Sequence, residues 1–278
     1  MTPPSTDQRR VAVSVFVLVV VFLWIYLPDA GHGFLRDDYG WILGSRLDTI
    51  ADLPRLFRTN VGFYRPLVSA SFALDYAIWH LDPQGYAYTN LLLAAADAAL
   101  LFALLRRLRL STAAGVMATA AWAFNFHAVN MALLWTSGRT ALWLCLFGLA
   151  SVHAAFARRH VLAGAFVLAA MLCKEEAVLL PLVIVGIHLS ERRDHARLRG
   201  TLTVLAPLVA AVAVYGLLRT NSGAMGPATA PDYYQFTFNP LRVLRNVLLN
   251  QEILHIDLFH LTQFEKPSTQ VHTIWAAH

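Results

Sequence analysis

Long apolar runs separated by short polar connections dominate the chain. The first run, from Val11 to Leu27, carries no charge and approaches the roughly 20 residues that a membrane-spanning helix needs. It exceeds the about 7–15 apolar residues usual in a cleaved signal peptide, and no A-x-A site follows, so we expect a retained span. Further candidate spans lie at about residues 88–105, 112–126, 140–157, 161–173, 177–189 and 202–218. The pattern predicts an all-α integral membrane protein, a multi-helix transmembrane bundle.

Arginine clusters predict the orientation of these spans, because Lys and Arg in short loops stay on the cytoplasmic side. If Arg9 and Arg10 lie inside, every later cluster falls on the same side, at residues 106–109, 158–159 and 192–199. This alternation requires that the moderately apolar segment 64–81 does not cross the membrane completely. We therefore predict an external or re-entrant helix there, and a full crossing is the alternative.

The predicted orientation divides the chain into two regions. Residues 1–218 form the transmembrane region, with a first external loop at 28–63. Within that loop, apolar residues at near-helical spacing in 48–59 predict a short helix on the membrane surface. Residues 219–278 are expected to form an external loop and the start of further helices.

The composition agrees with a membrane protein and argues against other classes. Hydrophobic residues make up 57% of the 278 residues and charged residues 14%, and the mean hydropathy is +0.52. Cytoplasmic anchoring explains the net charge of +5, and no nucleic-acid motif accompanies it, so nucleic acid is not an expected partner. Cys145 and Cys173 lie in or at the end of apolar spans without metal-ligand spacing, so we expect buried thiols.

With this orientation, the chemically useful polar residues collect on or near the external face. Ionisable side chains in or beside a span are costly unless they are paired, solvated or used, so a one-sided set suggests a reaction centre that opens outward. Taken alone, Arg139 is more simply explained as a helix-end residue that reaches the interface. The set is Asp37, Asp38, Arg65, His127, Asn130, Arg139, Lys174, Glu175 and Glu176.

The charged residues Lys174, Glu175 and Glu176 interrupt an otherwise apolar stretch, residues 161–189. A plain external turn is one explanation. However, each flanking half has only about thirteen residues, or roughly 20 Å of helix at 1.5 Å per residue. The hydrocarbon layer is about 30 Å thick. We therefore expect the turn to lie recessed in a cavity that opens outward.

Asp37 and Asp38 follow the first span and are surrounded by the aromatic residues Phe34, Tyr39 and Trp41. A lone Asp-Asp pair is more often a turn or a solvated loop end. Here one carboxylate is placed to accept a proton from an attacking hydroxyl, while the other holds a cation or the acceptor. A metal or a basic partner would offset the repulsion between them. A divalent metal ion held by Asp37 and Asp38 is therefore a candidate cofactor.

Six short motifs occur in order along nearly the whole chain: FLRDDY at 34–39, YRPL at 64–67, GYAYTNLLL at 85–93, HAVNMALLWTSGR at 127–139, CKEEAVLLPL at 173–182 and FNPLRVLRN at 238–246. Together they resemble the multi-spanning C-type glycosyltransferases. The most similar group is the protein O-mannosyltransferase-like enzymes, including those that carry tetratricopeptide repeats and their bacterial relatives.

The resemblance implies a C-type bundle and an enzyme that transfers a sugar from a polyprenyl-phosphate-linked donor. The acceptor would be a hydroxyl of a protein, lipid or glycan at the external face of the membrane. A mannosyltransferase-like activity is implied, although no residue distinguishes mannose from another sugar. The implied location is a bacterial inner membrane, with the active site facing the periplasm or exterior.

The resemblance also implies roles for individual residues. One of Asp37 and Asp38 would be the catalytic base. Cations that hold the donor phosphate are implied at Arg65, Arg139 and Lys174, where guanidinium groups suit phosphate geometry. Groups that shape the sugar or acceptor site are implied at His127, Asn130 and Glu175.

The chain departs from the family pattern in three places. Ala128 stands where relatives often have proline, and Thr140 and Ala141 stand where they often have an acidic residue. Family members usually continue through several further spans, so we expect this chain to be shorter than its relatives.

Two other functional classes compete with an enzyme. A transporter or flippase for a lipid-linked intermediate would distribute polar residues along several helices, whereas the predicted spans are nearly free of charge except for Asp97. We expect Asp97 to face the bundle interior and hydrogen-bond there. A non-catalytic membrane scaffold is the third class.

Overall fold

The computed structural model describes residues 6–27, 33–35, 37–58, 63–125, 129, 131–190, 197–222, 224 and 241. The chain divides into two compact units, Met1–Pro227 and Ala228–His278, and all the assigned elements lie in the first. Every element in the described ranges is an α-helix or a 3₁₀ helix, and none is a strand. The prediction of an all-α protein is therefore confirmed.

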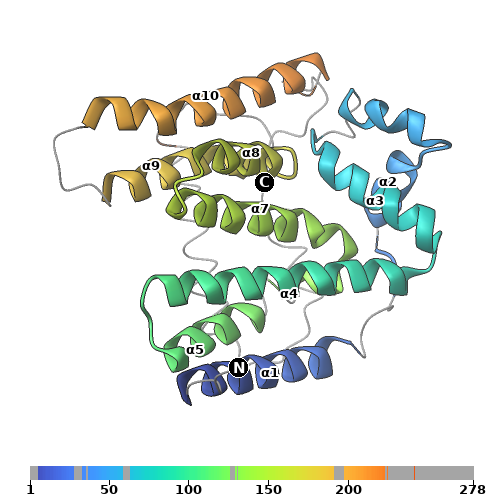
Figure 1. Cartoon of the computed structure of the whole chain (residues 1–278). Coiled ribbons are helices and arrows are strands. Elements are labelled where there is room, and N and C mark those ends of the chain that lie inside the picture. The colour runs from blue at the N-terminus through green and yellow to red at the C-terminus, as the bar shows by residue number, and fades with distance from the viewer. Residues whose placement is uncertain are drawn as a thin grey trace. The chain divides into compact units, whose positions relative to one another are not determined.

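The helices follow one another through short connections (Figure 1). The α-helices are α1 Thr6–Tyr26, α2 Asp37–Ser45, α3 Pro66–Trp79, α4 Pro83–Arg107, α5 Thr112–Ala123, α6 Met131–Leu134, α7 Arg139–Phe156, α8 His160–Met171, α9 Leu180–Ser190 and α10 Arg197–Asn221. The 3₁₀ helices are η1 Ile50–Phe57, η3 Thr136–Gly138 and η4 Glu175–Leu179.

Local sequence signals explain where several helices begin and end. Asp82 caps α4 by accepting a hydrogen bond from the backbone N–H of Gln84, and Ser111 caps α5 in the same way through Ala114. The arginine-rich connections after α4 and α7 turn through residues with positive φ, Arg109 at 65° and Arg158 at 57°. Both turns close with the paired backbone bonds of a helix C-terminal motif, so α4–α5 and α7–α8 form tight hairpins.

Within the described ranges, three helical segments are long and apolar enough to cross a membrane: Pro83–Arg107, Thr136–Phe156 and Thr201–Asn221. The apolar segments Val11–Tyr26 and His160–Met171 are helical but shorter. The stretch 161–189 breaks at Lys174 into α8, with 12 residues, and α9, with 11. Each corresponds to less than 20 Å of helix at about 1.5 Å per residue, so neither half alone reaches across a hydrocarbon layer of about 30 Å.

The helices of the first unit pack around α7, which contacts α4, α8 and α9, while α10 packs against α8 and α9 and α1 packs against α5 (Figure 1). Three buried apolar clusters form between them. One joins α7, α8 and α10, and a second joins α1, α4, α5, α6 and α7. The third joins Ile42 of α2, Val68 and Phe72 of α3, Tyr86 of α4, and Cys173. This third cluster supports the polar residues described below.

Gly164 allows α8 and α10 to approach closely. A Cβ at Gly164 would lie 2.8 Å from the carbonyl oxygen of Pro207, whereas a Cβ at Gly216 of α10 would meet nothing within 4 Å. We expect Gly164→Ala to lower the free energy of unfolding by about 1–3 kcal/mol. The matched Gly216→Ala should leave it unchanged or raise it by up to about 1 kcal/mol, because alanine favours helix. Thermal unfolding in detergent measures both, and equal effects would contradict the close contact.

Candidate functional site

The two adjacent aspartates occupy different environments. Both lie in the first turn of α2, where the positive end of the helix dipole favours carboxylates. Asp37 is exposed, whereas Asp38 is completely buried. The pair is therefore not two equivalent groups: Asp37 alone presents a carboxylate to its surroundings.

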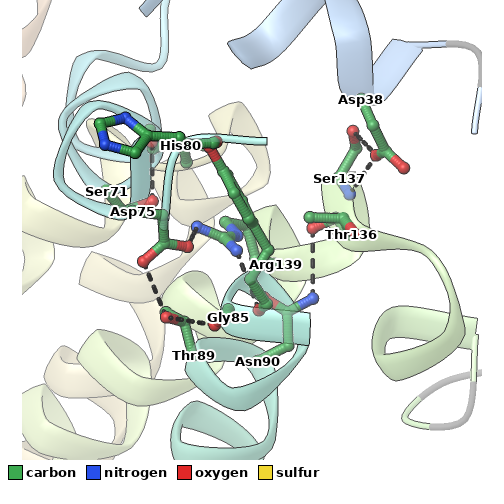
Figure 2. A network of polar contacts seen from close by, with 12 residues as sticks. Asp38, Ser71, Asp75, His80, Gly85, Thr89, Asn90, Thr136, Ser137 and Arg139 are labelled. Atoms are coloured by element: carbon green, nitrogen blue, oxygen red, sulfur yellow. Dashed lines mark hydrogen bonds and ion pairs between the residues drawn. The ribbon is translucent and has the colours of Figure 1, made fainter. Parts of the chain in front are cut away.

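Asp38 ties the start of α2 to η3, which directly precedes α7. Its Oδ1 accepts a hydrogen bond from the backbone N–H of Ser137 at 2.7 Å and a second from the Ser137 hydroxyl. Its Oδ2 accepts from the backbone N–H of Leu35 at 2.8 Å. Figure 2 shows the carboxylate facing Ser137 on the η3 segment. The two bonds from Ser137 fix α2 against η3.

A buried ion pair lies next to this contact. Nη1 of Arg139, the first residue of α7, lies 2.6 Å from Oδ2 of Asp75 on α3, and both side chains are almost completely buried. Asp75 Oδ1 accepts from the Thr89 hydroxyl of α4 at 2.8 Å, and Arg139 Nη2 donates to the Tyr86 carbonyl at 3.2 Å. Figure 2 shows Asp75 and Arg139 facing each other, with Thr89 on the other side of the carboxylate. The network joins α3, α4 and α7.

Aromatic rings enclose the Arg139 guanidinium. Its Cζ lies 4.2 Å from the centre of the Phe72 ring and 5.5 Å from that of Tyr86. Such cation–π contacts stabilise a cation that has been removed from water. Because the guanidinium has no exposed surface, Arg139 is not a residue that reaches out to a membrane interface. The simpler explanation of Arg139 given by the sequence is therefore wrong.

The Asn90 side chain of α4 holds the η3 segment by hydrogen bonds. Its side-chain amide donates to the carbonyl oxygen of Ala132 at 3.1 Å and to that of Thr136 at 3.2 Å. Figure 2 shows the bond to Thr136. Gly138 makes this fold possible, since a Cβ there would lie 2.6 Å from the Cα of Ala132. Ser137 is therefore held in place from both sides, by Asn90 through its neighbour Thr136 and by Asp38.

A second polar cluster joins segments that are distant in the sequence. Arg65, just before α3, donates through Nε at 3.0 Å and Nη2 at 2.8 Å to Oε2 of Glu175. Arg219, near the end of α10, lies 3.5 Å from Oε1 of the same carboxylate. These side chains are partly exposed, at 13% for Arg65, 20% for Arg219 and 27% for Glu175. We name Arg65, Glu175 and Arg219 the bridged arginine cluster.

Lys174 and Glu176 form a more exposed ion pair beside this cluster, with Nζ and Oε1 3.0 Å apart. Burial by itself raises the pKa of Glu176. A hydrogen bond with its own backbone and the nearby Lys174 ammonium lower the pKa by more, so it lies below the ordinary value. Glu176 is therefore ionised at neutral pH, and it partly neutralises Lys174.

The sequence-predicted residues thus fall into separate groups. Asp38 and Arg139 are buried structural contacts, whereas Asp37 is exposed and Arg65, Lys174 and Glu175 are partly exposed. His127 and Asn130 lie outside the described residues. No described contact joins Arg139 to Arg65 or Lys174. The third apolar cluster nevertheless lies close to both regions, because it contains Phe72, which packs on Arg139, and Cys173, which precedes Lys174.

Asp37 and Asp38 do not fit a shared divalent metal ion. Asp38 is completely buried and both of its oxygens accept hydrogen bonds, so Asp37 is the only carboxylate of this pair that is open to a metal ion. Among the described residues, no group of three or more His, Cys, Asp or Glu side chains is placed to hold a metal. The repulsion between Asp37 and Asp38 is offset instead by the helix N-terminus and by the donors around Asp38.

Sequence reasoning missed three residues that organise the site. Asp75 lies in the apolar segment 64–81, where a carboxylate needs a buried partner. That signal pointed to an ion pair but not to Arg139 as the partner. Arg219 follows the predicted span 202–218 directly, and Ser137 carries no signal of its own.

Asp97 lies in the interior of the bundle, as expected. Its side chain is completely buried in the middle of α4, and the Cys145 thiol of α7 is its polar neighbour. Neither carboxyl oxygen forms a hydrogen bond of normal geometry with a described residue. The partner of the expected hydrogen bond is therefore the Cys145 thiol, a weak donor whose contact with the carboxyl group lies outside normal hydrogen-bond geometry.

Comparisons with known proteins identify no relative. No family model matches the chain, and no curated protein and no solved structure is significantly similar to it. Any functional inference therefore depends on the motifs in the sequence and on the geometry of the site.

Proposed function

We propose that this protein is a membrane glycosyltransferase of the C-type class. It would transfer a sugar from a polyprenyl-phosphate-linked donor to an acceptor hydroxyl at the external face of a bacterial inner membrane. The observation that carries the proposal is the difference between the two aspartates at the start of α2: Asp37, its first residue, is exposed, and the next residue, Asp38, is buried and anchors this helix start to Ser137. A general base has to be accessible and held in position, and this arrangement provides both.

The reaction assigns one role to each part of the site. The acceptor oxygen attacks the anomeric carbon and loses its proton to Asp37, while the bond between the anomeric carbon and the phosphate oxygen breaks. The polyprenyl phosphate leaves with the electron pair of that bond. The transition state has oxocarbenium character, as in glycoside hydrolysis. Arg65 and Lys174 are the accessible cations of the predicted set, so they are proposed to stabilise the departing phosphate.

The region around Asp38 and the bridged arginine cluster pack against the same apolar cluster. The third apolar cluster contains Ile42 from α2, Val68 from α3 and Cys173, which precedes Lys174. In addition, the backbone N–H of Leu67 donates to the carbonyl of Leu172 at 3.3 Å, which ties the start of α3 to the turn before η4. A shared support of this kind favours a single site over two unrelated ones.

The test is a transfer assay with the purified chain in lipid. Radiolabelled polyprenyl-phosphate mannose, glucose and N-acetylglucosamine are each supplied with extracted membrane acceptors, and label in the acceptor fraction is measured. Transfer from any one donor supports the proposal and identifies the sugar. Movement of labelled donor across the bilayer without transfer would instead support a flippase. A chain that shows neither activity would favour a scaffold.

A further inference from the structure

We propose that the bridged arginine cluster is a phosphate-binding site in which Glu175 occupies the place of the ligand. The ligand class is a phosphate ester, either free or attached to a lipid, that displaces the Glu175 carboxylate from Arg65 and Arg219. The inference rests on the proposed function for the identity of the lipid donor, but not for the binding of phosphate. It adds Arg219 to the site and gives Glu175 a competing role in place of a sugar or acceptor contact.

The geometry of the cluster suits a ligand with more oxygens than a carboxylate. Both donors of Arg65 converge on one oxygen of Glu175, Oε2, at 2.8 and 3.0 Å. The other oxygen, Oε1, lies 3.5 Å from Arg219, well beyond the about 2.7–2.9 Å of a strong charge-assisted hydrogen bond. A phosphate monoester, the form in which the polyprenyl phosphate leaves, has three non-bridging oxygens and up to twice the charge of a carboxylate, so it can engage both guanidinium groups more fully than Glu175 does.

Packing below the cluster holds the two arginines in place. Arg219 donates to the Tyr215 hydroxyl at 2.7 Å, one turn earlier on α10. The Tyr215 ring packs against that of Tyr64 at 6.2 Å between centres, and Tyr64 directly precedes Arg65. The two tyrosines are buried and the two arginines are partly exposed. A rigid base that presents two guanidinium groups reduces the entropy lost when an anion binds.

The charge of the cluster also favours an anion. Arg65 and Arg219 together carry two positive charges and are matched by the single carboxylate of Glu175. The neighbouring ion pair of Lys174 with Glu176 adds no net charge. Counted over the described residues, the cluster therefore retains one uncompensated positive charge in a partly buried position, where attraction for an anion is less screened than at a fully exposed surface.

The experiment measures binding rather than transfer. The full chain is purified in a neutral detergent, and the affinities of farnesyl phosphate and of inorganic phosphate are determined by calorimetry. Arg219→Gln and Arg65→Gln should each weaken farnesyl phosphate binding by roughly 10–100-fold. Glu175→Gln should strengthen it by about 3–10-fold, because the competing carboxylate is removed. Arg58→Gln, which removes an exposed arginine at the end of η1, is the matched control and should have no effect.

The outcomes distinguish a free phosphate from a lipid phosphate as the ligand, and they test this inference separately from the proposed function. Equal affinities for inorganic and farnesyl phosphate would show that the site reads only the phosphate, and competition by phosphatidylglycerol vesicles would identify bulk lipid headgroups as ligands. Weaker binding in Glu175→Gln, with unfolding temperature unchanged, would overturn the displacement. Unaltered binding in Arg219→Gln would also overturn the site. Phosphate binding without sugar transfer would leave this inference standing while the proposed function fails.

Discussion

Replacing Asp75 with leucine should lower the free energy of unfolding by about 3–5 kcal/mol. The substitution leaves the Arg139 guanidinium completely buried without its carboxylate, whose Oδ2 lies 2.6 Å from Nη1. The remaining partners are the Tyr86 carbonyl at 3.2 Å and the rings of Phe72 and Tyr86, which cannot replace a full negative charge. Thermal unfolding of the detergent-solubilised chain measures the loss.

The double variant Asp75→Leu with Arg139→Met provides the decisive comparison. A buried ion pair gains little over apolar side chains of similar volume, so removing both charges should recover most of the stability that either single change loses. Asp48→Leu, at an exposed position between α2 and η1, is the control and should change stability by at most about 0.5 kcal/mol. If the double variant were as unstable as Asp75→Leu, the unpaired charge would not be the cause.

The positions of the helices could be predicted from the sequence. Apolar runs with capping residues at their ends, such as Ser111 and Asp82, specify helices by local interactions alone. The break at Lys174 was also predictable, because Lys and Glu in the middle of an apolar run are costly in a continuous span. In the same way, the helical spacing within 48–59 correctly indicated η1, which forms as a 3₁₀ helix.

The partners of individual side chains could not be predicted from the sequence. Arg139 and Lys174 both stand at the edge of apolar runs in the sequence, yet Arg139 is buried against Asp75 and Lys174 is partly exposed. The difference arises from tertiary packing, since Asp75 comes from a helix 64 positions earlier in the chain. Likewise, Asp37 and Asp38 are adjacent in sequence but differ in exposure, because only Asp38 points toward Ser137. Pairing across such separations leaves no local pattern in one sequence.

The proposed transfer reaction should respond differently to substitution of Asp37 and of Asp38. Asp37→Asn removes an exposed carboxylate, so the transfer rate should fall by about 10²–10⁴-fold while the unfolding temperature stays unchanged. Asp38→Asn replaces a buried carboxylate that accepts from Ser137 and Leu35. An amide has one accepting oxygen only, so one of these donors loses its partner and the free energy of unfolding should fall by about 1–3 kcal/mol.

Ser137→Ala separates the proposed role of Asp37 as the base from the role of Asp38 as the anchor of α2. This variant deletes the hydroxyl that donates to Asp38 and leaves Asp37 untouched, so it should share the reduced stability of Asp38→Asn. Its transfer rate should fall less than that of Asp37→Asn, because the backbone N–H of Ser137 still holds Asp38 at 2.7 Å. Rates are measured with the labelled donor, and unfolding is followed on the same preparations. Transfer that survives Asp37→Asn would remove the base from the mechanism, whereas Asp38→Asn with full stability would remove the anchor. Since the two readouts are independent, each aspartate's role stands or falls on its own measurement.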